Sequence, residues 1–366
     1  MSVVMLMPVV MVTVMVRVMA VVRVIVVVVA VIVVAVIVVI VVPVIARRVV
    51  ARAAFGRGAA VPEGVVVVGV PVVRHLVIVS RSPGQQEPCV VCDREPMHVE
   101  SIAFYPVKGC RRVEVERAEV EPWGLAGDRR WLVVDAATGV AITLRDTTAM
   151  VGIQPVPRPG GLVLRAPGLP DLTVDEPRDH ELIEVKVWGF AGPAMRAGDE
   201  ADGWLTRALA RQVRLVFLDD PTRRAVDPDF GTAVDRVSFA DDYPVSLANL
   251  GSLAALNDAI LDADPAAEPL PVTRFRPNLV VAEAAAWVED GWVGGRLRVG
   301  EVTFRVPKPI DRCVVTTTDQ ETGVKGHEPL RTLGRIRNVN QGLLFCLHLI
   351  PDGRGQVAVG DPVVPL

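Results

Sequence analysis

The feature that most constrains the fold is a change in residue pattern at His98. From there on, short runs of alternating apolar and polar residues are divided by Gly, Pro and Asp. Alternation with a period of two is typical of half-buried β-strands. Such runs occur at 99–107, 113–121, 129–135, 162–167, 183–189, 213–218, 278–283, 295–306, 312–318 and 355–364. The sequence therefore predicts a mainly β fold of the α+β class, built around barrels.

Two segments have helical spacing instead. Segment 200–212 repeats apolar residues on one helical face, and segment 252–263 does the same with Ser252 as the expected N-cap. Between them, 218–235 is rich in charge and proline, which is typical of a domain seam. We therefore expect one domain over 98–220 and a second over 221–366, with few helices in either.

Residues 1–97 form a different kind of sequence. Valine fills 26 of the first 50 positions, and nineteen apolar residues without a charge run from Val24 to Val42, enough to cross a bilayer as a helix. One interpretation is a membrane anchor at 24–42. The other is that this low-complexity segment comes from a start codon placed too early, with the protein beginning at Met97. A cytoplasmic location follows from the second interpretation.

Composition excludes some classes of partner and site. The net charge of −3 leaves no basic stripe for nucleic acid. Five cysteines are too few and too uneven for a disulfide framework, which favours a reducing compartment. They are Cys89, Cys92, Cys110, Cys313 and Cys346.

The run PKPIDRCVVTTTDQETG places Cys313 just before a turn and next to Arg312. In an extended strand its side chain would share a face with Val315 and Thr317. A neighbouring cation favours the thiolate, the form that attacks electrophiles or binds metals. The alternative is an inert buried cysteine, which is the commoner state of a free thiol.

Several cationic motifs accompany this cysteine. YPVKG carries Lys108 beside Gly109, DRRW carries Arg129, and RFRPN carries Arg276 and Asn278. Guanidinium groups bind phosphate and other oxyanions in a bidentate manner. Each motif taken alone is more often a solvated charge or a structural ion pair. Together they indicate an anionic ligand.

These motifs resemble those of the MOSC family, named for the carboxy-terminal domain of molybdenum-cofactor sulfurases. The resemblance is closest to two-part members, such as the mitochondrial amidoxime-reducing component and its bacterial relatives, which pair an N-terminal β-barrel domain with a MOSC β-barrel domain. The matching segments are YPVKGC (105–110), DRRWLVVD (128–135), SFADDYPV (238–245), SLAALN (252–257), RFRPNLVV (274–281), EDGW (289–292), RCVVTTTDQETG (312–323), EPLRTL (328–333) and VGDPV (359–363).

The resemblance implies a molybdenum cofactor, molybdopterin, whose metal is bound by Cys313 as the catalytic ligand. It implies that cofactor-binding residues lie in five of these segments, 105–110, 128–135, 238–245, 274–281 and 312–323. It also attaches pyridoxal phosphate binding to the family. Thr316 and Thr317 would orient the cysteine segment or donate to the pterin. Relatives often have serine where this chain has Gly109, so one hydroxyl donor is lost. The implied cofactor-binding residues are Lys108, Gly109, Arg129, Asp241, Asp242, Arg276, Asn278, Arg312, Thr316 and Thr317.

The implied activity is reduction of a small N-hydroxylated or N-oxygenated substrate. Because the chain stops at Leu366 without an iron–sulfur domain, electrons are expected from a separate ferredoxin or flavoprotein. No protein general acid is evident, since His348 lies in an apolar run and is expected to be a core residue.

The alternative function is a carrier that holds molybdenum cofactor or sulfur on Cys313 without turnover. A membrane is a partner only if 24–42 is translated.

Overall fold

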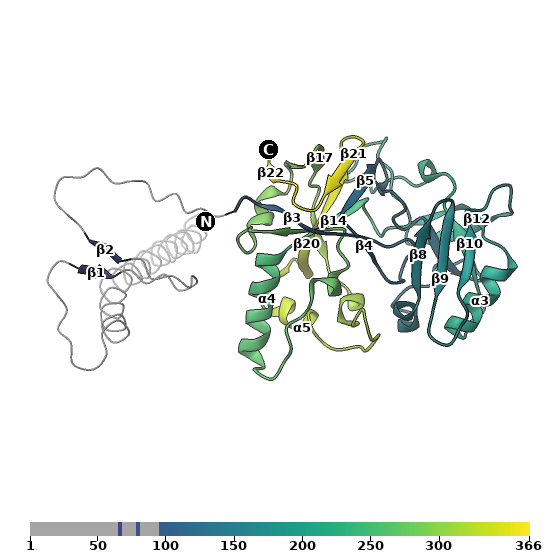
Figure 1. Ribbon diagram of the computed structural model, residues 1–366, viewed down its shortest axis with the longest axis horizontal. Helices are drawn as coiled ribbons and strands as arrows, with labels where there is room; N and C mark the ends of the chain where they lie inside the picture. Colours follow the sequence, from purple (N-terminus) through teal and green to yellow (C-terminus); the bar gives the residue numbers. More distant parts are fainter. Residues whose placement is uncertain (1–64, 68–77, 81–94) are drawn as a thin grey trace, which may run out of the picture. The chain divides into compact units, whose positions relative to one another are not determined.

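The computed structural model describes residues 65–67, 78–80 and 95–366 (Figure 1). The chain divides into two units, 1–91 and 92–366. Nearly all of the described elements belong to the second unit, which contains every candidate site residue.

In the first unit, two short strands pair antiparallel: β1 (Val65–Val67) with β2 (Ile78–Ser80). The apolar run 24–42 lies outside the described residues, so its role as an anchor stays a prediction. Within the described segments, no helix is both long and apolar enough to span a membrane.

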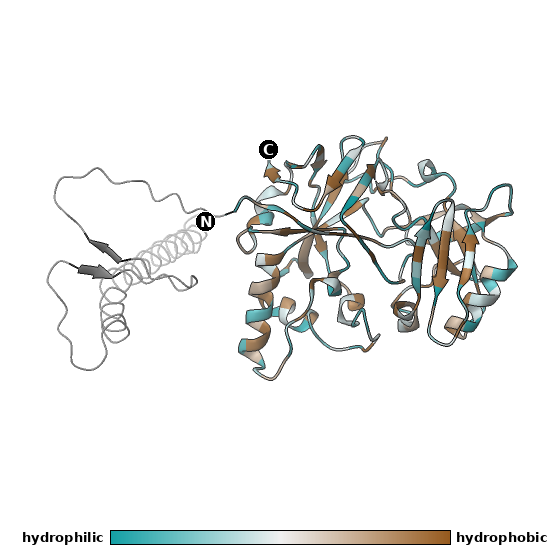
Figure 2. Ribbon diagram, viewed as in Figure 1, coloured by the Kyte–Doolittle hydropathy of each residue, from teal (hydrophilic) through white to brown (hydrophobic). Residues whose placement is uncertain are grey.

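A ten-stranded sheet organises the second unit. Its strands follow the order β22-β16-β17-β20-β14-β15-β3-β4, with β18 and β19 also paired to β20. Hydrophobic residues run along these strands (Figure 2), and their side chains form a buried core that includes Leu247, Phe304 and Leu347. The strands are β3 (His98–Phe104), β4 (Val113–Val115), β14 (Val245–Asn249), β15 (Leu279–Ala282), β16 (Arg296–Val299), β17 (Val302–Arg305), β18 (Pro309–Asp311), β19 (Asn338–Val339), β20 (Gly342–Pro351) and β22 (Val363–Pro365).

The parallel pair β14 and β15 is joined by helix α4 (Leu250–Ala263), because parallel neighbours need a crossover connection. Helix α5 (Leu330–Ile336) packs against α4 and β20 (Figure 1). The predicted N-cap of α4 is wrong: Asn249 caps the helix by accepting from Gly251 N at 2.8 Å. Ser252 instead donates its hydroxyl to buried Glu289 at 2.6 Å.

Three smaller sheets and helix α3 (Asp199–Leu209) complete the described fold, with orders β10-β9-β8, β11-β12-β13-β7 and β21-β5-β6. Trp204 of α3 is buried in the core that α3 shares with β9, β10, β7 and β13. The strands are β5 (Arg117–Glu121), β6 (Gly124–Leu125), β7 (Trp131–Asp135), β8 (Gln154–Arg158), β9 (Gly161–Arg165), β10 (Leu172–Asp175), β11 (Leu182–Val187), β12 (Phe190–Arg196), β13 (Val213–Phe217) and β21 (Gly355–Ala358).

Strand pairing crosses the predicted domain seam. Strands β3 and β4 precede residue 220 but belong to the ten-stranded sheet, and β5 pairs with β21 near the C-terminus. The division into 98–220 and 221–366 therefore stays a prediction. The mainly β architecture with few helices is confirmed.

One predicted strand is wrong. Residues 312–318 do not form an extended run: they contain the 3-10 helix η6 (Val314–Thr317) with Cys313 as its N-cap residue. Threonine hydroxyls favour this turn by bonding to carbonyls three residues earlier. The other 3-10 helices are η2 (Thr148–Gly152), η3 (Pro221–Arg223), η4 (Val272–Phe275) and η5 (Val288–Trp292).

Candidate functional site

A cavity of about 630 Å³ collects most of the predicted site residues. Its lining comes from the loops after β3, β6, β7 and β13, from the turn between β11 and β12, from the end of η4 and the residues after it, from the segment 308–316, and from β14 and β20. Thr317 is not part of the lining, although it lies in the turn behind it. The predicted residues that line the cavity are Lys108, Gly109, Arg129, Asp241, Asp242, Arg276, Asn278, Arg312, Cys313 and Thr316.

The Cys313 thiol is half-buried and begins the η6 turn. Thr316 donates its hydroxyl to Cys313 O at 2.9 Å, and Thr317 donates to Val314 O at 2.8 Å. Both hydrogen bonds lie within the η6 turn and stabilise it. They support an orienting role for both threonines, the first of the two roles expected for them.

The guanidinium that contacts the thiol belongs to Arg145, whose Nη2 donates to Cys313 Sγ at 2.9 Å. Arg312, the neighbour in sequence, instead donates to Phe275 O at 2.6 Å. In the structure, the contact with the sulfur that the sequence suggested for Arg312 is made by Arg145. No sequence signal identifies Arg145, because it is a single basic residue in a loop far from Cys313 in the chain.

The buried side chain of Lys108 forms an ion pair with the half-exposed carboxylate of Asp241 at the cavity wall. Lys108 Nζ also donates to Phe239 O at 2.7 Å. Burial lowers the pKa of Lys108, while its partner Asp241 opposes that shift. Burial alone would raise the pKa of Asp241, but Lys108, Trp188 and Arg145 outweigh it and hold that pKa below its usual value.

Arg224 supports the segment that carries Asp241. Its guanidinium donates to the carbonyls of Ser238, Ala240 and Asp241 from a buried position. Burial lowers the pKa of Arg224 to about 10, so the group stays charged at neutral pH. This arginine was not predicted as a site residue, and its role is to hold a loop that lines the cavity.

Arg129 lies in the left-handed region at φ 48° and is enclosed by protein groups. It forms an ion pair with the fully buried carboxylate of Asp128 and donates to Asn278 Oδ1 at 3.0 Å. Asp128 also accepts from Tyr105 N at 2.8 Å. Asn278 completes its own bonding with Ser246, accepting from its backbone N at 3.1 Å.

Arg276 also contacts the ring of Tyr105. The Tyr105 ring centroid lies 4.2 Å from Arg129 Cζ and 4.1 Å from Arg276 Cζ. Burial lowers the pKa of Arg276 to about 10. An aromatic face stabilises each guanidinium at this depth through cation–π attraction.

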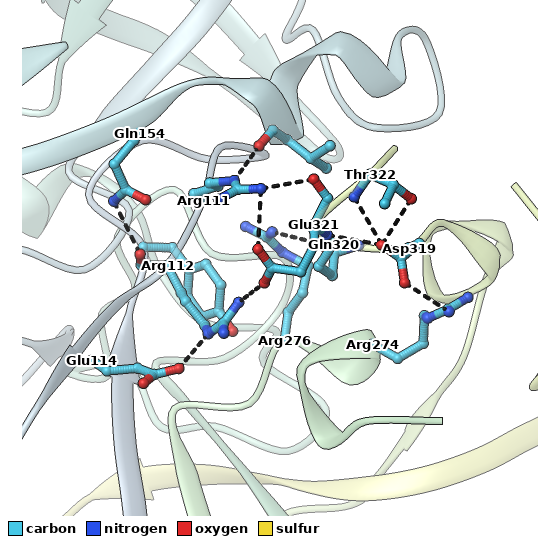
Figure 3. Close-up of polar contacts among 12 residues, drawn as sticks. Arg111, Arg112, Glu114, Gln154, Arg274, Arg276, Asp319, Gln320, Glu321 and Thr322 are labelled. Carbon is cyan, nitrogen blue, oxygen red and sulfur yellow. Dashed lines mark hydrogen bonds and ion pairs between the residues drawn. The ribbon is translucent and has the colours of Figure 1, made fainter. Parts of the chain in front are cut away.

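The turn after Cys313 is held by basic residues from distant parts of the chain (Figure 3). Arg276 donates to Gln320 Oε1 at 2.7 Å, and Arg274 to Asp319 Oδ2 at 3.2 Å. Arg111 donates to Glu321 O at 2.7 Å. The arginines of RFRPN and the segment after YPVKG thus fix the loop that follows the thiol.

The cavity has more positive than negative side chains. Its lining contains six basic and three acidic residues. His348 also lines it, and burial with Lys308 and Arg312 nearby lowers the pKa of this imidazole to about 3, so it is neutral at pH 7. The basic residues are Lys108, Arg129, Arg145, Arg276, Lys308 and Arg312; the acidic ones are Asp241, Asp242 and Asp311.

Gly109 has a backbone requirement that the sequence did not reveal. Its φ is +85°, and a Cβ there would lie 2.9 Å from Met150 Cε. Replacing Gly109 with Ala is therefore expected to lower the free energy of unfolding by about 1–3 kcal/mol, because the left-handed conformation is strained for any other residue. Urea denaturation measures this change.

Gly152→Ala is the matched control for that substitution. Gly152 has no positive φ, and no atom lies within 4 Å of the position that its Cβ would take. It should change the free energy of unfolding by less than about 1 kcal/mol. Equal stability of the two variants would contradict the backbone argument.

Two family models match the chain. The MOSC N-terminal beta barrel domain covers residues 96–212, and the MOSC domain covers residues 234–364. The chain is 30% identical over 284 residues to mitochondrial amidoxime reducing component 2 of Bos taurus, covering 72% of this chain and 82% of that protein. It is 29% identical to mitochondrial amidoxime-reducing component 1 of Homo sapiens, with the same coverage. The chain therefore belongs to the MOSC family, among the members that join a MOSC N-terminal β-barrel domain to a MOSC domain.

Proposed function

We propose that this chain is a molybdenum-cofactor-dependent reductase of N-hydroxylated compounds. The observation that carries the proposal is the placement of the Cys313 thiol in the wall of a cavity with an excess of basic side chains. For an amidoxime, the balanced reaction consumes two electrons and two protons, breaks the N–O bond, and yields the amidine and water. The named relatives, amidoxime-reducing components, support this substrate class.

The residues present fit the cofactor. An anionic pterin with a phosphate and a dithiolene suits a pocket whose lining has six basic residues and three acidic ones. Among the described residues, no group of three or more His, Cys, Asp or Glu side chains is placed to hold a metal ion. Cys313 as a single soft ligand therefore suits a metal whose other ligands come from the cofactor.

Each residue has a distinct proposed task. Cys313 binds the metal, and Thr316 and Thr317 fix its turn. Arg129, Arg276 and Asn278 form the deep wall against the cofactor, where their contacts with protein groups already fix their positions. Arg312 and the ion pair of Lys108 with Asp241 complete the cofactor-binding wall.

When bound, the cofactor supplies the two-electron redox chemistry. The protein orients the substrate and holds protons near it. Asp242 is the carboxyl best suited to hold a proton, because burial and the adjacent charge of Asp241 raise its pKa. His348 stays neutral and can only offer one ring N–H as a donor.

We also propose that electrons come from a separate redox protein of the ferredoxin or flavoprotein type, and that the reaction takes place in the cytoplasm. Pyridoxal phosphate binding has no part in this proposal, because Lys108 is engaged by Asp241 and Phe239 O in the cavity wall.

The test uses the full chain expressed in a host that makes molybdenum cofactor. Purified protein should contain close to one molybdenum per chain, and it should convert benzamidoxime to benzamidine with reduced methyl viologen as the electron source. Protein from a host unable to make the cofactor is the control. Metal-free protein from the competent host, or metal-loaded protein without turnover, would contradict the proposal.

The same preparation tests the alternative carrier function. A carrier would bind cofactor, or show one added sulfur on Cys313 by mass spectrometry, and would reduce no N-hydroxylated compound with any donor. Turnover of benzamidoxime by the loaded chain would exclude a role limited to carriage.

A further inference from the structure

Trp188 occupies an unusual position for a large aromatic residue. It lies at the turn between β11 and β12, with a left-handed φ of 52°, and it lines the cavity. Its relative exposure is 52%. Tryptophan is highly buried on average, so an indole that is half exposed at a cavity has surface available for a ligand.

Contacts on one side fix the orientation of this indole. Trp188 Nε1 donates to Asp241 Oδ1 at 2.9 Å, and Arg145 Cζ lies 4.4 Å from the ring centroid. Arg145 in turn donates to Cys313 Sγ at 2.9 Å. The ring is thus separated from the thiol by a single guanidinium. Because one face and the N–H edge are occupied, the exposed surface consists of the opposite face and the outer edge.

Exposure separates two regions of the cavity. The Arg129 side chain is 13% exposed, and Asn278 is 1% exposed. Trp188 and the side chain of Asp241 are each more than half exposed. A ligand that exchanges with solvent at every turnover must pass the exposed region. A cofactor that stays bound suits the enclosed one.

We infer that Trp188 is a specificity-determining residue, whose free face stacks on a planar conjugated group attached to the carbon that bears the N-hydroxylated nitrogen. Arg145 braces the occupied face. The site therefore favours aromatic amidoximes over amidoximes of saturated rings. This inference rests on the proposed function and names the substrate class of that same cavity.

The test compares two substrates with the same reacting group. Benzamidoxime carries a planar ring, and cyclohexanecarboxamidoxime carries a puckered ring of similar size. In Trp188→Ala, the preference for benzamidoxime, measured as the ratio of kcat/KM values, should fall about 3- to 10-fold, the factor typical of one lost aromatic pair. Trp188→Phe keeps an aromatic face without the N–H donor and should retain most of the preference.

Trp123→Ala is a matched control. The Trp123 indole also donates to a carboxylate, Glu121 Oε2 at 2.7 Å, and an arginine, Arg354, also lies 5.4 Å from its ring. Trp123 does not line the cavity. Its replacement should leave the substrate ratio and the molybdenum content at wild-type values.

A binding measurement supplies a readout without turnover. Isothermal titration calorimetry of benzamidine and cyclohexanecarboxamidine should show the same 3- to 10-fold loss of aromatic preference in Trp188→Ala. An unchanged ratio in both assays would overturn the inference. A fall in molybdenum content that parallels the loss would also overturn it, by assigning the indole to the cofactor. Wild-type protein that reduces neither amidoxime would contradict the proposed function instead, while the calorimetry would still decide the role of Trp188.

Discussion

Replacing Cys313 with alanine is expected to leave a folded chain that has lost its metal and its reductase activity. Removing a residue that only supports a metal ligand lowers metal affinity about 10- to 100-fold, and removing the ligand itself should exceed that range. Cys313 supplies the only sulfur in the cavity lining. Metal analysis of the purified protein and the rate of benzamidoxime reduction measure the two losses.

The fold should survive this substitution, because the thiol is half-buried and its main partner is a single guanidinium. We expect the free energy of unfolding to change by less than about 1 kcal/mol. Cys346→Ala is the control. Burial raises the pKa of Cys346 to about 12, which keeps that thiol protonated and unsuited to bind metal. Full metal content in Cys313→Ala would reject the proposed ligand.

The convergence of the motifs was predictable, but only through their resemblance to a family. Lys108, Arg129 and Arg276 lie far apart in the chain, and no periodicity brings them together; their meeting depends on strand pairing between β3 and β15. The resemblance supplied that long-range information. The cavity around Cys313 was therefore anticipated in its residues but not in its contacts.

Local reasoning failed where tertiary or side-chain bonding overrides strand propensity. The β-branched run at 314–317 predicted a strand, yet threonine hydroxyls bond to their own turn and stabilise a 3-10 helix. Strand β20 was missed for the opposite reason. It lies inside the ten-stranded sheet with both faces buried, so its sequence is continuously apolar rather than alternating.

Site residues that lie outside any sequence motif were the hardest to predict. Arg145 and Trp188 each stand in a loop without a surrounding motif, and only the fold brings them to Cys313 and Asp241.

Conversely, arginines that were expected to offer an unpaired charge to a ligand already form hydrogen bonds with the protein. Arg276 donates to Gln320 and to Cys110 O. Such contacts hold a charged group in place before a ligand arrives.

Among the variants proposed, Arg129→Met should show the largest loss of stability, because it leaves a buried carboxylate without its ion-pair partner. Asp128 is 1% exposed, and its ion-pair partner is Arg129. Breaking a buried pair by removing one member costs about 3–5 kcal/mol, since the remaining charge is left without compensation. Urea denaturation should record that loss, and the molybdenum content should fall with it.

The double variant Asp128→Asn with Arg129→Met separates folding from ligand binding. Asparagine at position 128 removes the unpaired buried charge and keeps an oxygen that can accept from Tyr105 N. Much of the lost stability should therefore return. Molybdenum should not return, because the cation that faces the cavity is still missing. Recovery of both properties would show that Arg129 serves the fold alone.

The pH dependence of Arg129→Met provides an independent check. Burial already raises the pKa of Asp128, and Arg129 opposes that shift, so its removal should raise the pKa further. A carboxyl with a folded-state pKa above its unfolded value contributes stability that is present at low pH and lost as pH rises through the folded-state pKa. The deficit of the variant relative to wild type should therefore be smaller at about pH 5 than at about pH 8. A deficit independent of pH would mean that the cost comes from lost packing of the arginine rather than from the charge of Asp128.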